Sequence, residues 1–169
     1  MKITTAIGFL TLLLLILSTQ TRAAGSDDRM SIFVDCHCQD AVGGDFCAAF
    51  KDKLKSTPAY QLVDKTDTYG IAVHLWCIDL FAKMPGVDSK LSSTMSAVSV
   101  AFTLYSDRLP GEVYEDSSVF RVGKDATDQM AQSLLTAVGQ IVTANKSVFE
   151  HIRATPKAPA AAPTQRVIQ

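Results

Sequence analysis

The stretch that decides the fold is residues 30–54, MSIFVDCHCQDAVGGDFCAAFKDKL. Over residues 30–38 the side chains alternate in character from one position to the next, which predicts a β-strand. One face of this strand then carries Ile32, Val34, Cys36 and Cys38, and the other carries Phe33, Asp35 and His37. We expect the face with the aliphatic side chains and cysteines to lie against the core.

A helix is predicted directly after this strand, over residues 40–56. Asp40 can cap it, because its carboxylate can accept hydrogen bonds from the free amide groups of the first turn. Apolar side chains follow at helical spacing, namely Val42, Phe46, Ala49, Phe50 and Leu54. Gly43 and Gly44 weaken the first turn. They either permit a close approach to the sheet or delay the helix start to Asp45.

Further strands and a second long helix are predicted outward from this unit. The expected elements are strands over 60–63, 69–80 and 96–105, an edge strand over 118–122, and a helix over 126–152 capped by Asp125. Polar turns and loops over 64–68, 83–93 and around 109–117 separate them, the last one including Glu115 and Asp116. This order predicts one α+β domain over residues 30–152. Its mostly antiparallel sheet of four to five strands has two helices packed on one face.

Both ends of the chain are predicted to lie outside that domain. Residues 1–23 have the pattern of a secretory signal peptide, with Lys2 before an apolar stretch and small residues ahead of a cleavage point at Ala24. Residues 24–29 form a flexible leader, and the Pro/Ala-rich residues 153–169 form a disordered tail. No later segment is apolar enough to span a bilayer, so we expect no stable membrane insertion after cleavage and a periplasmic or secreted location.

The composition and net charge exclude several classes of protein. The chain has 169 residues, with 16 Lys+Arg and 17 Asp+Glu, and 47% of its residues are hydrophobic. Removing residues 1–23 takes away Lys2 and Arg22 and leaves 14 basic and 17 acidic residues, a net charge of −3. These values exclude a wholly disordered or collagen-like chain and a strongly basic nucleic-acid-binding protein.

Four cysteines lie beyond the predicted signal peptide, namely Cys36, Cys38, Cys47 and Cys77. An even number in an oxidising compartment favours one or two structural disulfides. Cys47 can pair with either Cys36 or Cys38, Cys77 can take the remaining partner, and buried thiols are the other structural option. The alternative is a thiol- or metal-dependent protein that uses all four cysteines. That reading has little support, because the chain lacks a CxxC motif and paired zinc-ligand spacing. We expect no metal and no cofactor.

The outward face of the strands offers a candidate binding surface. Its residues are Phe33, His37, His74, Trp76 and Tyr105, and aromatic side chains with polar tips are typical of recognition surfaces. The surface is available unless a loop or the tail covers it. A small hydrolase built around His37 or His74 is a further hypothesis, but no GxSxG motif accompanies these histidines.

Three segments carry a resemblance to known proteins, namely Asp40–Phe46, Ser56 with Tyr60–Val63, and Tyr69–Val73. The run resembles small exported bacterial proteins of unknown function. Its order is similar to the N-terminal domain of the Tol–Pal translocation protein B and related envelope accessory domains, over about residues 30–150. The resemblance implies a non-enzymatic periplasmic accessory or binding module that recognises another periplasmic or envelope protein. It transfers no site residue.

Overall fold

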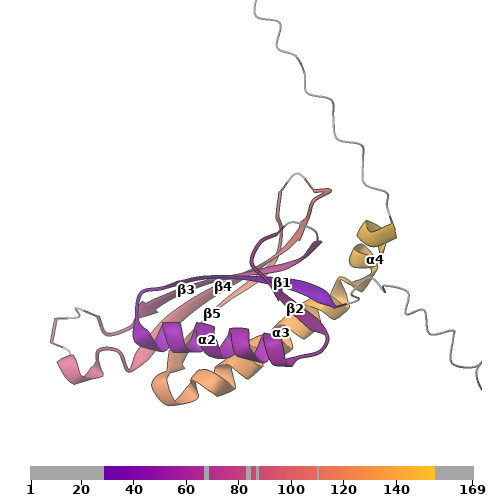
Figure 1. The fold of residues 1–169 in the computed structure, drawn as a ribbon. Coiled ribbons are helices and arrows are strands. Elements are labelled where there is room, and N and C mark those ends of the chain that lie inside the picture. The colour runs from indigo at the N-terminus through magenta and orange to yellow at the C-terminus, as the bar shows by residue number, and fades with distance from the viewer. Residues whose placement is uncertain (1–28, 67–68, 83–84, 87, 110, 155–169) are drawn as a thin grey trace, which may run out of the picture.

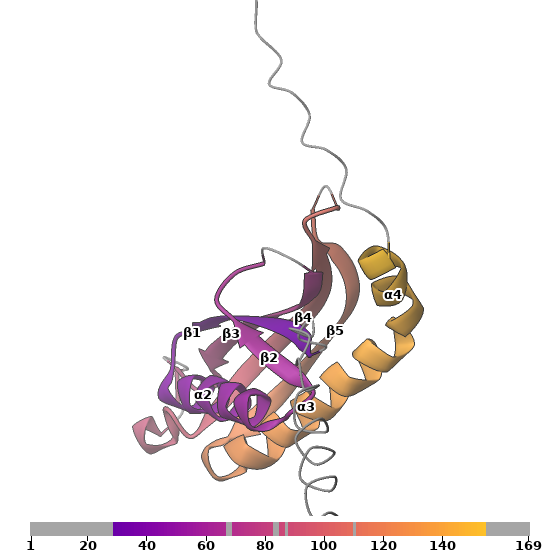
Figure 2. The same ribbon diagram turned by 45° about the vertical axis from the view of Figure 1, so that its right-hand side comes forward.

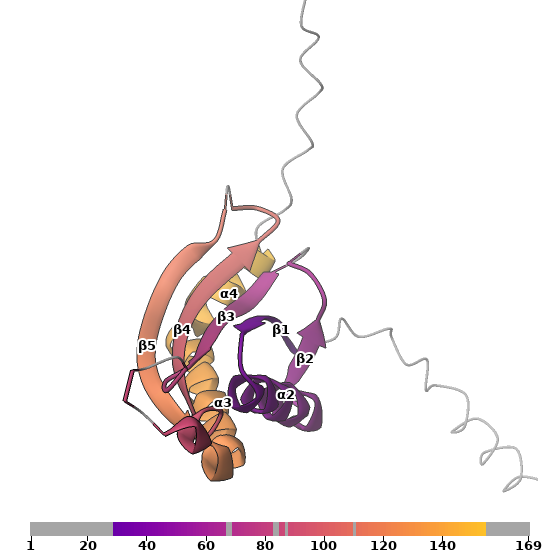
Figure 3. The same cartoon turned by 90° about the vertical axis from the view of Figure 1, so that its left-hand side faces the viewer.

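The computed structural model describes residues 29–66, 69–82, 85–86, 88–109 and 111–154. In these residues a five-stranded sheet forms one layer and helices α2 and α3 form a second layer beneath it (Figure 1). The strands are β1 (Met30–Cys38), β2 (Tyr60–Val63), β3 (Tyr69–Asp79), β4 (Met95–Ser106) and β5 (Val113–Gly123). The helices are α2 (Ala41–Ser56), α3 (Thr127–Ala144) and α4 (Lys146–Ala154). Figure 3 shows the twisted sheet arching over α2 and α3, which leaves its other face without a helix.

The strand–helix–strand unit forms as the sequence predicts. Asp40 is the N-cap of α2, and its side chain accepts a hydrogen bond of 2.8 Å from the backbone N–H of Gly43. The helix returns the chain to the end of the sheet at which β1 began, so β2 can pair with β1 in parallel. This unit places the 30–38 strand in the interior of the sheet.

The sheet is mixed, with strand order β2-β1-β3-β4-β5. The predicted α+β class and the two helices on one face are confirmed. The predicted antiparallel pairing holds for the three longest strands, since β4 is antiparallel to both β3 and β5. Strand β1 differs, because it is parallel to both of its neighbours.

The core lies between the sheet and the two helices. The aliphatic face of β1 and one face each of β3 and β4 meet the apolar side of α2, as the alternation predicts. The largest fully buried side chains are Ile32, Val42, Phe46, Phe50, Leu54, Ile71, Val73, Leu75, Val98, Val100, Val122 and Val138.

Gly43 is the point of closest approach between α2 and the sheet. A Cβ atom at Gly43 would overlap the Cβ of Cys77, whereas a Cβ at Gly44 would meet nothing within 4 Å. Of the two predicted roles for these glycines, close approach is therefore the correct one for Gly43. The helix already begins at Ala41 rather than at Asp45.

Strand β5 is longer than the predicted 118–122, because it begins at Val113. Glu115 and Asp116, which we expected in a loop, belong to this strand. This segment lies at the edge of the sheet and pairs only with β4. The hydrogen bonds to β4 hold it in strand conformation, although its sequence is polar and shows no apolar alternation. The register with β4 shifts beside Phe102 and Thr103, which leaves Glu115 as an extra, unpaired residue.

The long helix predicted over 126–152 is two helices that meet at Asn145 (Figure 2). The Asn145 side-chain amide donates to the carbonyl of Ile141 and to the carboxylate of Glu115, both at 3.1 Å. Such bonds compete with a continuous helical ladder. The predicted cap at Asp125 is also wrong, because Asp125 lies in a 3-10 turn (Lys124–Ala126) and α3 has no side-chain cap.

The predicted signal peptide lies outside the described residues, as do residues 24–28 of the leader and 155–169 of the tail. Helix α4 ends at Ala154 and so extends two residues into the predicted tail. Across the part of the chain that the structure describes, no helix has the length and apolar character needed to cross a membrane.

Candidate functional site

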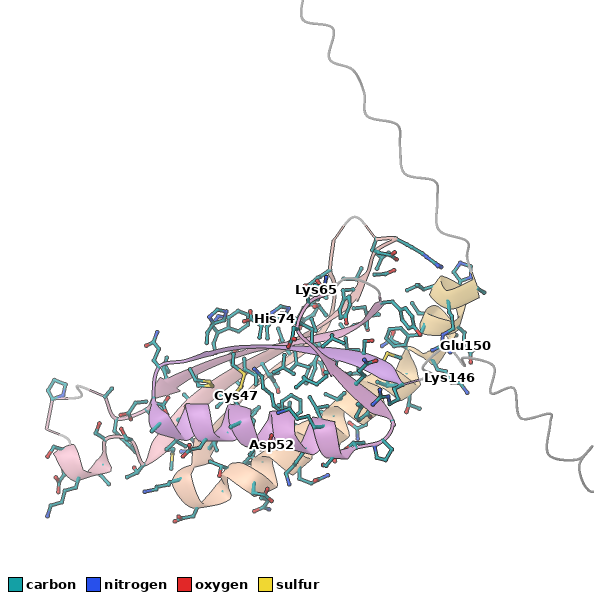
Figure 4. The ribbon with its side chains drawn as sticks, in the orientation of Figure 1. Cys47, Asp52, Lys65, His74, Lys146 and Glu150 are labelled. Atoms are coloured by element: carbon teal, nitrogen blue, oxygen red, sulfur yellow. A yellow bond between two sulfur atoms is a disulfide. The ribbon has the colours of Figure 1, made fainter. Side chains whose placement is uncertain are left out.

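The face of the sheet opposite α2 and α3, here called the open face, carries the candidate binding residues. Strand pairing arranges its side chains in four rows across β1, β3, β4 and β5. The rows are Phe33, Ala72, Thr103 and Tyr114; Asp35, His74, Ala101 and Ser117; His37, Trp76, Ser99 and Val119; and Ile78, Ala97 and Arg121. Figure 4 shows His74 on the side of the sheet away from Cys47 and Asp52 of α2.

Trp76 lies at the centre of an aromatic cluster on the open face. It is 46% exposed, and the rings of His37 and His74 lie nearly parallel to it with centroid distances of 6.0 and 5.9 Å. Phe33 meets the ring of His74 edge-on at 6.5 Å. The pairing follows from the fold, because His37 and Trp76 are register partners and His74 precedes Trp76 by two residues on the same face of β3.

Two carboxylates flank His74. Asp35 Oδ2 lies 3.5 Å from His74 Nδ1 and 3.0 Å from His37 Nε2, so it links the two histidines. On the other side, Glu112 Oε2 lies 2.8 Å from His74 Nε2 and accepts a hydrogen bond from the Thr103 hydroxyl. The cluster therefore combines exposed aromatic surface with negative charge.

The environment of Glu112 keeps it ionised. Desolvation by burial raises the pKa of Glu112, but the hydrogen bonds from Thr103 and His74, together with the charge of His74, lower it below the ordinary value of 4.5. Because the pKa is lower in the folded chain than in the unfolded chain, ionised Glu112 stabilises the fold above pH 4.5. This contribution is lost as the pH falls through the lower folded value.

We therefore expect Glu112→Gln to reduce the loss of stability between about pH 6 and about pH 3. The reduction should be modest, because the side chain is 36% exposed and water screens its interactions. Urea unfolding of both proteins at the two pH values measures it. Glu150→Gln on α4 is the control, because it removes an exposed carboxylate far from the cluster. An identical acid sensitivity in wild type and Glu112→Gln would contradict the assignment.

The structure brings together four of the five predicted surface residues, namely Phe33, His37, His74 and Trp76. Tyr105 does not join them, because it is only 3% exposed and its ring fills the space above Gly70. Sequence reasoning missed Glu112 and Thr103. The alternation of β4 places Thr103 on the outward face, but Glu112 precedes β5 and reaches His74 only through the β4–β5 connection.

All four cysteines form disulfides, Cys36–Cys47 and Cys38–Cys77, with Cα separations of 6.6 and 4.3 Å. The first ties β1 to α2, and the second joins register partners on β1 and β3. Cys36 and Cys38 alternate along β1 with Asp35 and His37. The two disulfides therefore lie on the reverse side of the strand that carries the candidate surface, between the sheet and α2 (Figure 4).

The geometry does not favour nucleophilic catalysis at His74. The hydroxyl of Thr103 lies 3.4 Å from His74 Nε2, but it donates its hydrogen to Glu112, which also holds the same ring nitrogen. The ring is thus not free to act as a base toward this hydroxyl. Among the described residues, no group of three or more His, Cys, Asp or Glu side chains converges closely enough to hold a metal ion.

A hollow of about 670 Å³ lies on the helix side of the sheet. It is bordered by the end of α2, by β2 and by α3, and includes Tyr60, Leu135 and Gly139. No charged side chain lines it, so it has no charge with which to select a ligand.

No family model matches the chain, and no curated protein matches it in sequence. Among solved structures, the fold is similar to that of a minor lipoprotein from Acinetobacter baumannii. The two chains are 14% identical, with a TM-score of 0.39, and the match covers 68% of this chain and 94% of the lipoprotein chain.

Proposed function

We propose that this chain is an exported, non-enzymatic accessory or binding protein that recognises another protein of the cell envelope through the open face of its sheet. The proposal rests on one observation above all: an exposed aromatic and aliphatic surface on a sheet face that no described helix covers. The predicted signal peptide supports export to the periplasm or the medium.

Further apolar side chains are exposed on the open face near Trp76. Ile78 is 53% exposed and lies in the row next to that of Trp76, and Val119 is 77% exposed and lies in the same row as Trp76. Single exposed apolar residues are common on soluble proteins, but contiguous ones mark interaction sites. Tryptophan is also among the residue types most enriched where binding energy concentrates.

The disulfides support binding because they hold the surface in place before a partner arrives. Cys38–Cys77 cross-links the pair of residues next in register to His37 and Trp76, and Cys36–Cys47 anchors the same strand to α2. A surface that is already rigid loses less conformational entropy on binding. This arrangement gives the cysteines a structural role in recognition.

The same disulfides give the thiol- or metal-dependent alternative little support. Cysteine attacks substrates and binds metals as its thiolate, and a cysteine in a disulfide has no thiolate. In the state described, none of the described cysteines is free.

Trp76→Ala should abolish capture of the partner without unfolding the chain. The side chain is nearly half exposed, so its removal deletes contact area and little core packing. Chemical crosslinking in the producing cells, followed by mass spectrometry of adducts on wild type and variant, measures the effect. The control is Val148→Ala, which truncates a 43% exposed side chain on α4. Retention of the same adduct by Trp76→Ala would contradict the proposal.

A further inference from the structure

The two carboxylates of the open face differ from three other acidic side chains in having no lysine or arginine partner among the described residues. Asp52, Asp128 and Glu150 each pair with a lysine, at 3.3, 2.8 and 3.8 Å. Within the described ranges, Asp35 and Glu112 form ion pairs with histidines and with no lysine or arginine. Among the described residues, the only basic side chains that these acids meet are therefore His37 and His74.

Each of these carboxylates also has an oxygen to spare. Both contacts of Asp35 use Oδ2, and both contacts of Glu112 use Oε2. Oδ1 and Oε1 make no hydrogen bond to any described residue, and the side chains are 35% and 36% exposed. A carboxylate accepts several hydrogen bonds, so each can take a further donor without giving up its histidine.

An aromatic ring that attracts cations belongs to the same cluster. The indole of Trp76 is the best of the natural rings for cation–π contact, and its neighbour His74 touches both carboxylates. The ring of His74 has its centroid 5.9 Å from that of the indole and contacts both carboxylates, so their negative charges favour a cation on the exposed part of the indole. Arginine suits this arrangement better than lysine, because its planar guanidinium can stack on the ring while its N–H groups bind carboxylate oxygens.

From these observations we propose that the open face binds an arginine side chain of a partner polypeptide, stacked on Trp76 and bonded to Asp35 and Glu112. The inference rests on the proposed function and specifies the chemistry of the partner. Charge complementarity carries it, because no lysine or arginine among the described residues pairs with these acids, and both acids contact His74, the ring neighbour of the exposed indole. Arg121 is at the far edge of the same face, in the row of Ile78.

Trp76 is the only tryptophan of the chain, so its fluorescence reports directly on this site. The probe is a tetra-arginine peptide added to the disulfide-intact exported chain. We expect a saturable change in Trp76 emission, weaker binding as salt is raised from about 0.05 to about 0.5 M, and weaker binding of tetra-lysine. Tetra-glutamate should leave the emission unchanged.

Charge-neutralising variants decide whether the carboxylates are responsible. Glu112→Gln and Asp35→Asn should each weaken tetra-arginine binding by about tenfold, because each removes a charge-assisted hydrogen bond. Asp52→Asn is the matched control, since it neutralises an exposed carboxylate on α2, away from the open face (Figure 4). It should leave the affinity unchanged.

Three results would overturn the inference. They are no saturable change in emission with tetra-arginine, binding of tetra-arginine to Glu112→Gln and Asp35→Asn as tightly as to wild type, and a saturable change with tetra-glutamate. These failures are distinguishable from failure of the proposed function. If Trp76→Ala still abolishes the cellular adduct while tetra-arginine does not bind, the open face is a binding surface for a partner of different chemistry.

Discussion

Replacing Cys38 and Cys77 together by alanine should lower the free energy of unfolding by about 4 kcal/mol. The disulfide closes a separation of 39 residues, and a cross-link that closes a longer loop removes more conformational entropy from the unfolded chain. Alanine is the right replacement because Cys77 is fully buried, where a serine hydroxyl would add a desolvation penalty. Urea unfolding under non-reducing conditions measures the change.

The second disulfide is the internal control for this prediction. Cys36–Cys47 closes a separation of only 11 residues, so its removal by alanine substitution should cost about 3 kcal/mol, roughly 1 kcal/mol less. Both double variants keep one disulfide and replace two cysteines by alanine, so the comparison tests the effect of loop length. A larger loss from the Cys36–Cys47 pair would show that native contacts, rather than the closed loop, determine the stabilisation.

Gly43→Ala should destabilise the protein by about 3 kcal/mol, at the upper end for an overpacked core. The added methyl group would overlap the Cβ of Cys77, which a disulfide holds in place, so the overlap cannot be relieved by rotating a flexible side chain. Helix α2 would have to move away from β3 and loosen the packing of Val42 and Phe46 on the sheet. Thermal and urea unfolding measure the loss.

Gly44→Ala is the matched control for this substitution. It adds the same methyl group one residue later, where nothing lies within 4 Å, and it raises helix propensity. The expected result is a gain of about 0.5–1 kcal/mol. Equal effects of the two substitutions would contradict the close approach of α2 to the disulfide.

The first half of the fold was predictable because its signals are local. Alternation over residues 30–38, the cap at Asp40 and the apolar spacing of α2 depend on neighbours in sequence, and the structure confirms each of them. The second half depends on partners distant in sequence. Residues 113–117 become strand only because β4 lies beside them, and the helix breaks at Asn145, whose side chain reaches Glu115 across the fold.

The candidate site shows the same division. Alternation alone placed Phe33 and His37 on one face of the first strand and His74 and Trp76 on one face of another, and parallel pairing made these faces continuous. The burial of Tyr105 could not be predicted, because it depends on Gly70 in the neighbouring strand. The role of Glu112 could not be predicted for the same reason, because its contact partner His74 lies 38 residues away in the sequence. The choice of disulfide partners likewise required the register between β1 and β3.

The claim that the open face is a binding surface is tested most directly by photocrosslinking from defined positions in the producing cells. A photoreactive amino acid is placed at Ser99, beside Trp76 on the open face, and in a second variant at Gln132, exposed on α3 in the opposite layer. We predict one defined protein adduct from position 99, its loss when Trp76→Ala is added, and no such adduct from position 132. The same adduct from both positions, or an adduct from position 99 that survives Trp76→Ala, would contradict the account.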